Sequence, residues 1–282
     1  MKKITALMLS SAMMLSLAAC GGSASTETVS SEAASSEAAS SEAVSTEEAA
    51  SADAAAVTTV NAGKLTMSTN AAFPPYEMTT DSGDLEGIDI EVAGAIAEKL
   101  GLELQVDDMD FDAALLATQS GKSDMVMAGV TVTDERQKVM DFSDTYAEGI
   151  QSIIVPEDSD IASADDLTGK AIGTQRGTTG YIYCTDDFGE DNVIAYDDGL
   201  TAVQALNNGQ VDAVVIDNAP AQEFVAANPG LKILDTAYAQ EDYAIGVAKG
   251  NTQLLDAING ALKELQDDGT LQAIVDKYIT AE

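Results

Sequence analysis

The sequence predicts an α/β fold, because strand-like and helix-like segments alternate along most of the chain. Short runs rich in β-branched residues, such as residues 64–69 and 211–216, are followed by segments whose apolar residues recur at helical spacing. This alternation is typical of sheets with largely parallel strands. Residues 1–60 lack the pattern, so we expect the fold to begin near residue 61.

Composition and periodicity place the individual elements. Nine segments are predicted as strands: 64–69, 103–106, 123–128, 152–155, 170–174, 192–196, 211–216, 231–234 and 243–248. Five segments are predicted as helices: 89–100, 111–120, 200–208, 253–267 and 271–279. In the first helix, Asp89 can cap the start and Gly101 can end it.

The first 19 residues have the features of a secretory signal, with Lys2 and Lys3 before an apolar stretch. This stretch is shorter than the roughly 20 residues that span a membrane. It ends in small residues directly before Cys20, which resembles a bacterial lipobox. The resemblance implies cleavage before Cys20 and a lipid on its sulfur. An ordinary signal with an incidental cysteine is the alternative.

Residues 20–60 are predicted to be the lipidated cysteine followed by a disordered spacer. From residue 21 to 59 the chain is dominated by Ala, Ser, Thr and Glu and has no aromatic residue or Leu. Such a segment cannot bury enough apolar surface to offset its conformational entropy, although transient helix is an alternative. A flexible chain of this length spans roughly 35 Å.

Composition excludes several kinds of chemistry. The chain has no His, which removes Ser-His-Asp and Cys-His catalysis and the commonest zinc ligand. We expect no metal site and no cofactor. The net charge of −35 opposes binding to nucleic acid and favours solubility. Cys184 is the only cysteine besides Cys20, so we expect a buried, free thiol.

Ligands in α/β folds bind at the carboxyl ends of strands, which directs attention to the loops that follow them. Four such loops stand out: 70–76, 129–136, 175–180 and 217–220. The two arginines of the chain, Arg136 and Arg176, both lie in these loops. A guanidinium pairs with a carboxylate through two hydrogen bonds, so this placement indicates anion recognition. An ion pair of Arg136 with Asp134 or Asp141, and a solvent-exposed Arg176, are the alternatives.

Five motifs, in order along residues 62–282, resemble those of family 3 extracellular solute-binding proteins, the amino-acid-binding subunits of ABC importers. They are Phe73-Pro74-Pro75-Tyr76-Glu77, residues 86–92, residues 129–136 with Asp141-Phe142-Ser143, residues 177–180, and residues 211–217. The resemblance implies a two-lobed clamshell of type II, each lobe a mixed, mainly parallel sheet flanked by helices. Lobe 1 would be residues 61–145 plus 243–282, and lobe 2 residues 150–239. Residues 146–149 and 240–242 would be the hinges.

The resemblance also implies roles for individual residues. Arg136 and Thr131 would bind the ligand α-carboxylate together with the N–H groups of Thr178 and Thr179. Asp217 and the carbonyl of Gly129 would bind the α-ammonium. The remaining candidates would surround the side chain, although ordinary lobe core is the alternative for the phenylalanines: Asn70, Phe73, Tyr76, Phe111 and Gln175. Contacts from both lobes imply that ligand closes the cleft.

Together these features predict extracytoplasmic capture of an amino acid and its delivery to a membrane permease by a lipid-anchored monomer that is not an enzyme. A neutral polar or sulfur-containing ligand is favoured, because Asn70 stands where cation-binding relatives often have an acid and Ile216 offers no polar group. The alternatives are an enzyme resembling cyclohexadienyl dehydratases and a sensor or wall-associated lipoprotein without transport.

Overall fold

A computed structural model describes residues 57–235 and 237–279, which belong to one compact unit, Ala54–Glu282. The predicted signal, Cys20 and residues 21–56 of the spacer lie outside the described residues. Within the described ranges, no helix combines the length and apolar character needed to cross a membrane.

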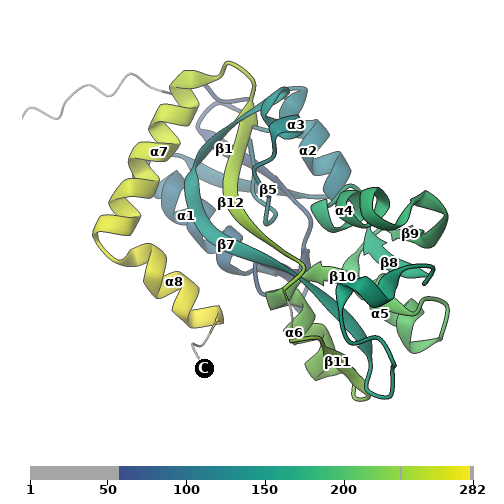
Figure 1. The fold of residues 1–282 in the computed structure, drawn as a ribbon. Helices are drawn as coiled ribbons and strands as arrows, with labels where there is room; N and C mark the ends of the chain where they lie inside the picture. The colour runs from purple at the N-terminus through teal and green to yellow at the C-terminus, as the bar shows by residue number, and fades with distance from the viewer. Residues whose placement is uncertain (1–56, 236, 280–282) are drawn as a thin grey trace, which may run out of the picture. The chain divides into compact units, whose positions relative to one another are not determined.

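Nine strands form one mixed sheet in the order β5-β1-β6-β12-β7-β10-β8-β9, with β11 paired to β7 (Figure 1). One group of strands consists of β1 (Lys64–Thr69), β5 (Glu103–Asp108) and β6 (Met125–Val126), and we call the part of the fold built around it lobe 1. The other group consists of β8 (Ile172–Gln175), β9 (Val193–Tyr196) and β10 (Ala213–Asp217), and we call the part built around it lobe 2. Strands are parallel within each group, as the alternating pattern predicts.

Two long strands connect the groups. They are β7 (Met140–Pro156) and β12 (Ala239–Ala248), which pair antiparallel and curve from one lobe into the other (Figure 1). The sequence predicted only parts of both, residues 152–155 and 243–248. The proposed hinges, 146–149 and 240–242, lie inside these strands and face each other, with Gly149 opposite Glu241. Their function as hinges stays a prediction.

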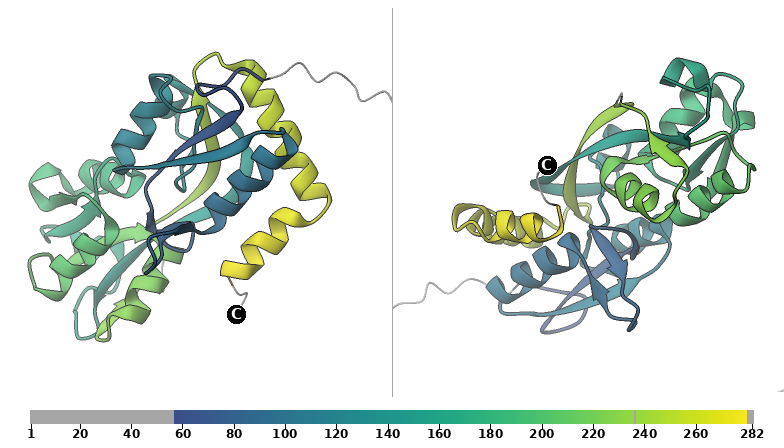
Figure 2. Two further views of the ribbon diagram at one scale, coloured as in Figure 1. Left: turned by 180° about the vertical axis from the view of Figure 1, so that it is seen from behind. Right: turned by 90° about the horizontal axis from the view of Figure 1, so that it is seen from below.

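Helices cover both lobes. Lobe 1 has α1 (Ile88–Lys99), α2 (Phe111–Gln119), the short α3 (Asp134–Gln137), α7 (Thr252–Asp267) and α8 (Thr270–Tyr278). Lobe 2 has α4 (Thr179–Phe188), α5 (Gly199–Asn207) and α6 (Asn218–Ala227). Figure 2 shows α7 and α8, in yellow, beside α1. The five predicted helices are confirmed as α1, α2, α5, α7 and α8, whereas α3, α4 and α6 were not among the predicted segments.

Short elements complete the fold. A second, small sheet contains β2 (Ala72–Phe73), β3 (Glu77–Thr79) and β4 (Leu85–Glu86), and β11 covers Leu231–Ile233. Two 3-10 turns span Ala164–Leu167 and Glu190–Asn192. Cys184 is buried in the core of lobe 2 as a free thiol, as predicted.

The prediction that Asp89 caps α1 was wrong. Gly87 is the residue before the helix, at φ +131°, and a Cβ there would overlap the carbonyl oxygen of Tyr76. Asp89 lies one residue inside the helix and is fully buried. Its Oδ2 accepts hydrogen bonds from the Gly129 N–H (3.0 Å) and the Tyr146 hydroxyl (2.9 Å). Asp89 therefore holds the start of the 129–136 loop in place and does not cap the start of α1.

Candidate ligand-binding site

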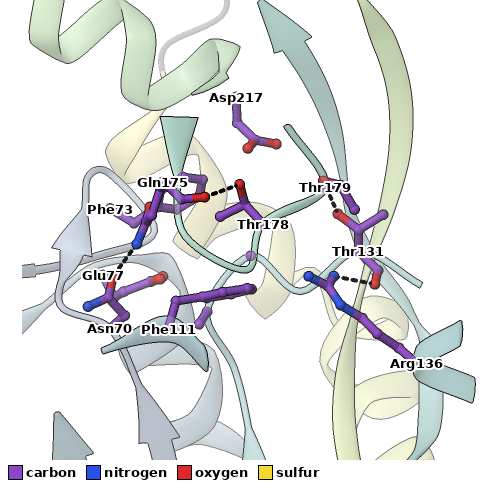
Figure 3. A pocket seen from close by; sticks show the side chains of 12 residues that line it. Asn70, Phe73, Glu77, Phe111, Thr131, Arg136, Gln175, Thr178, Thr179 and Asp217 are labelled. Carbon is purple, nitrogen blue, oxygen red and sulfur yellow. Dashed lines mark hydrogen bonds between the residues drawn. The ribbon is translucent and has the colours of Figure 1, made fainter. Parts of the chain in front are cut away.

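A pocket between the two lobes brings together ten of the eleven predicted ligand-binding residues (Figure 3). Ala128 and Glu77, which were not predicted, also line it. The ten predicted residues are Asn70, Phe73, Phe111, Gly129, Thr131, Arg136, Gln175, Thr178, Thr179 and Asp217. In Figure 3, Arg136 and Thr131 lie at one side of the pocket and Asn70 and Glu77 at the other, with Phe111 between them.

Arg136 is a buried cation, with only 8% of its surface exposed. Its Nη1 donates to the carbonyl of Thr131 (2.8 Å) and its Nη2 to the carbonyl of Gly177 in lobe 2 (3.2 Å). The guanidinium also lies over the Phe111 ring, 5.4 Å from its centroid. Burial lowers the pKa of Arg136, although the negative charge of Glu241 opposes this shift.

Within the described part of the chain, Arg136 makes no ion pair with a carboxylate. The alternative pairing with Asp141 is wrong, because Asp141 pairs with Lys249 at 2.6 Å. Neutral carbonyls compensate a buried positive charge less well than an anion does. The Arg136 guanidinium is therefore able to bind a carboxylate supplied by a ligand.

Arg176 lies outside the pocket, as the alternative interpretation expected. Its side chain is 52% exposed, 3.6 Å from the Asp197 carboxylate, and it donates to the carbonyl of Ala195. Gln175, the residue before it, ends β8 and points into the pocket instead. Arg176 follows directly after β8, and its side chain points to solvent, away from the side that Gln175 faces.

Asp217 ends β10 and is 7% exposed. Its Oδ2 accepts from Gln151 Nε2 (2.8 Å) and its Oδ1 from the hydroxyl of Tyr243. Gln151 Nε2 also donates to Glu241 (2.9 Å), so two buried acids share one amide. Burial, followed by the negative charge of Glu241, raises the pKa of Asp217 to about 7. A ligand ammonium would stabilise the ionised carboxylate.

The start of α4 borders the side of the pocket where Arg136 and Thr131 lie. Thr178 precedes the helix, and its hydroxyl accepts from the Tyr181 N–H. The hydroxyl of Thr179 is 3.5 Å from that of Thr131 in lobe 1. The first N–H groups of a helix have no acceptor within the helix, and its dipole favours an anion there. Arg136 and α4 thus offer complementary donors from the two lobes.

The opposite end of the pocket combines amides with a carboxyl group. Gln175 Nε2 donates to Asn70 Oδ1 across the lobes (2.8 Å), and Asn70 Nδ2 donates to the carbonyl of Met109 (3.0 Å). Glu77 is fully buried. Burial, with the negative charge of Asp89, raises the pKa of Glu77 well above its usual range. This end is therefore polar and offers hydrogen-bond acceptors as well as donors.

Phe73 forms part of the pocket wall and fixes the choice of residue at position 129. Gly129 has a φ of +53°, and a Cβ there would lie 2.8 Å from the Phe73 ring. Tyr76, also predicted to bind ligand, lies outside this pocket and borders a neighbouring hollow with Tyr243 and Tyr278. Its ring packs edge-on against Tyr243 and stacks with Phe73, so it supports the wall from behind.

Sequence reasoning missed Glu77, Gln151 and Glu241. Glu77 stands in the first quoted motif, directly after Pro74-Pro75-Tyr76, which was a usable signal. Gln151 and Glu241 lie on the crossing strands, and Glu241 Oε2 accepts from the Thr131 hydroxyl (3.1 Å). Only the pairing of β7 with β12 brings them to the site.

A family model described as bacterial extracellular solute-binding proteins, family 3, matches residues 65–281. The chain belongs to this family. Among curated proteins, it is 34% identical over 223 residues to the L-cystine-binding protein TcyJ of Escherichia coli K12, covering 78% of this chain and 84% of TcyJ. It is 32% identical over 231 residues to the arginine-binding extracellular protein ArtP of Bacillus subtilis, covering 78% of this chain and 87% of ArtP.

Solved structures of the family share the two-lobed fold. An ancestral arginine-binding protein bound to glutamine is 44% identical, with a TM-score of 0.74, covering 78% of this chain and 99% of that one. The arginine-, lysine-, histidine-binding protein ArtJ from Geobacillus stearothermophilus is 34% identical, with a TM-score of 0.74, covering 78% and 96%. These proteins are named as binding proteins, which agrees with the expected class of function.

The raised pKa of Asp217 predicts how the free energy of unfolding changes with pH. Because its pKa is raised on folding, the native state without ligand keeps a proton that the unfolded chain loses, and the free energy of unfolding falls as pH rises from about 4 to about 7. The Asp217→Asn variant has no titrating group at this position, so over this pH range its free energy of unfolding should fall by up to about 4 kcal/mol less than that of the parent. Without ligand, the variant should be more stable than the parent above pH 7. Urea unfolding across pH measures this, with the exposed Asp186→Asn as control. An identical pH dependence in the Asp217→Asn variant would contradict the raised pKa.

Proposed function

We propose that the chain captures a free α-amino acid outside the cytoplasm and delivers it to the permease of an ABC importer. The observation that supports this most strongly is the buried Arg136, unpaired with any described carboxylate, in a pocket that also contains the buried acid Asp217. The α-carboxylate of a zwitterionic amino acid would pair with Arg136, and its α-ammonium would pair with Asp217. Membership of the solute-binding family and the amino acid ligands named for its relatives support the same conclusion.

The α-carboxylate binds between Arg136 and the start of α4. Both donors of Arg136 now bond to backbone carbonyls, one of them Gly177 in lobe 2. A carboxylate replaces these neutral acceptors with a charged one that accepts two hydrogen bonds. The N–H of Thr179 at the start of α4 adds a donor. The Thr131 hydroxyl and the Thr178 N–H, which already donate to Glu241 (3.1 Å) and to the carbonyl of Gln175 (3.4 Å), would exchange these acceptors for the carboxylate.

The α-ammonium binds to Asp217, with the carbonyl of Gly129 as a second acceptor. Two donors already orient the Asp217 carboxyl group, Gln151 from β7 and Tyr243 from β12. The ammonium adds the positive charge that this buried acid lacks. Because Arg136 belongs to lobe 1 and Asp217 to lobe 2, ligand binding favours the closed arrangement of the lobes.

The side chain extends past Phe73 and Phe111 toward Asn70, Gln175 and Glu77. All three polar residues offer acceptors at this end. We therefore propose a ligand whose side chain has N–H donors, with arginine first and glutamine second. This revises the preference for a neutral side chain, which was based on Asn70 and Ile216 and did not consider Glu77.

An enzymatic role is less well supported. A cyclohexadienyl dehydratase acts on substrates with a second carboxylate, which in this pocket would face Glu77 or Asp217 instead of a cation. The proteins matched here are named as solute-binding proteins. We propose a monomer without catalytic activity, held at the membrane by lipid on Cys20 and separated from it by the spacer.

A thermal-shift screen against the common amino acids tests this function, with prephenate and arogenate included for the enzymatic alternative. Arginine or glutamine should raise the melting temperature of a protein beginning near Val60, since any ligand specific to the native state stabilises it by mass action. Stabilisation by prephenate alone, or by no amino acid, would overturn the proposal.

The two arginines provide a matched test of the binding mode. Arg136→Ala should weaken amino acid binding by about 2 to 5 kcal/mol, because it leaves the ligand carboxylate buried without its partner. Arg176→Ala removes the same side chain from a solvent-exposed position and should bind like the parent. Isothermal titration calorimetry measures both affinities. Loss of binding in the Arg176 variant alone would mean that the wrong arginine is assigned.

The anchor is tested in cells. Cys20→Ser removes the thiol that receives the lipid, so the protein should leave the membrane fraction or retain its signal. Cell fractionation with mass measurement of the product distinguishes these results from the parent. Membrane association and processing identical to those of the parent would rule out lipid on Cys20.

A further inference from the structure

We propose that Glu77 is a neutral carboxylic acid in the empty site and releases its proton when a cationic side chain binds, so that capture of a cation is coupled to loss of one proton. A neutral side chain would bind without this release. The inference rests on the proposed function, since it requires an amino acid side chain at the Asn70 end of the pocket.

The surroundings of Glu77 disfavour an ionised carboxylate. Glu77 begins β3, is fully buried and lines the pocket. Neither of its oxygens accepts a hydrogen bond from an N–H or hydroxyl group of the described residues. No described lysine or arginine forms an ion pair with it. A buried charge without a partner is costly, and a carboxyl group in this position takes up a proton instead.

Asp89 on α1 is the acid with the largest electrostatic effect on Glu77, and it is the better site for a negative charge. Its Oδ2 accepts from the Gly129 N–H and the Tyr146 hydroxyl, whereas Glu77 has no such donors. Its Oδ1 has no N–H or hydroxyl donor and can accept the proton of Glu77. Burial raises the pKa of both acids, that of Asp89 to about 6, and the hydrogen bonds from Gly129 and Tyr146 oppose the shift at Asp89. The two acids thus share one proton, held on Glu77.

None of the other described titratable groups that face Glu77 favours its ionised form. Asp108 on β5 and, when it is ionised, Asp217 on β10 raise its pKa, and the phenols of Tyr76 and Tyr146 are neutral. Among the described residues, no positively charged side chain lowers the pKa of Glu77. A guanidinium or ammonium group from the ligand would be the first positive charge at this end of the pocket.

The exchange conserves charge and atoms. The acid Glu77 and a cationic ligand combine to give a carboxylate paired with the cation, and the proton passes to water. With glutamine, the protonated acid remains neutral and hydrogen-bonds to the amide of the ligand. One site can therefore accept both kinds of side chain, and pH changes the preference between them. Below the pKa of Glu77 in the empty site, affinity for arginine should rise by up to about tenfold per pH unit relative to glutamine.

Calorimetry of arginine and glutamine binding, in buffers of different ionisation enthalpy, counts the protons released. At any pH at which Glu77 is protonated in the empty site, arginine should release about one proton more than glutamine. Asp217 serves the α-ammonium of both ligands, so its own titration cancels in the comparison. The ratio of the two affinities should rise with pH until Glu77 is ionised in the empty site.

Two variants localise the effect. Glu77→Gln has no proton to release, so the difference between the ligands should vanish, and arginine should weaken at least about tenfold more than glutamine. Glu86→Gln makes the same change at an exposed position on the neighbouring strand β4 and should behave like the parent. If Glu77→Gln does not fold, the comparison of ligands in the parent protein decides the question alone.

Equal proton counts for the two ligands in the parent protein would overturn the inference. Binding of glutamine without measurable binding of arginine would overturn it as well, and both results leave amino acid capture intact. Failure of every common amino acid to bind would instead contradict the proposed function.

Discussion

The site depends on one buried cation. Arg136 lies between the lobes, bonded to carbonyl oxygens of both and covered by Phe111, without a carboxylate partner among the described residues. Placing a guanidinium there is unfavourable unless an anion completes it. In the protein without ligand, the Arg136 guanidinium thus lacks an anionic partner, and a ligand carboxylate supplies one. Recognition and closure have the same physical origin, since the groups that complete the anion site belong to opposite lobes.

The crossing strands β7 and β12 place the remaining charges. Their pairing brings Gln151 and Glu241 together beside Asp217, so the ammonium site forms where the chain passes between lobes. Tyr243 of β12 donates to the same Asp217. A rotation about these strands would change the surroundings of Asp217 and Arg136 together. This geometry couples the binding of a charged ligand to the arrangement of the lobes, and no further residues are needed to connect the two.

The parts of the fold that follow local patterns were predictable. Helical periodicity located α1, α2, α5, α7 and α8, and the four strand-end loops contain nine of the ten predicted residues that line the pocket, all except Phe111. Local sequence could not show that Asp89 turns inward to bond Gly129, since that bond spans 40 residues. Nor could it show that Tyr76 packs behind Phe73 and against Tyr243. Each of these depends on contacts between distant segments, which periodicity does not encode.

Removal of the α-carboxylate from the ligand tests the central claim most directly. Arginine and agmatine differ only in this group, as do glutamine and 4-aminobutanamide, and titration calorimetry can compare each pair on the same protein. If the buried guanidinium is completed by the ligand carboxylate, the decarboxylated compounds should bind at least about thirtyfold more weakly, the equivalent of about 2 kcal/mol. Affinities equal to those of the parent amino acids would contradict this account of Arg136.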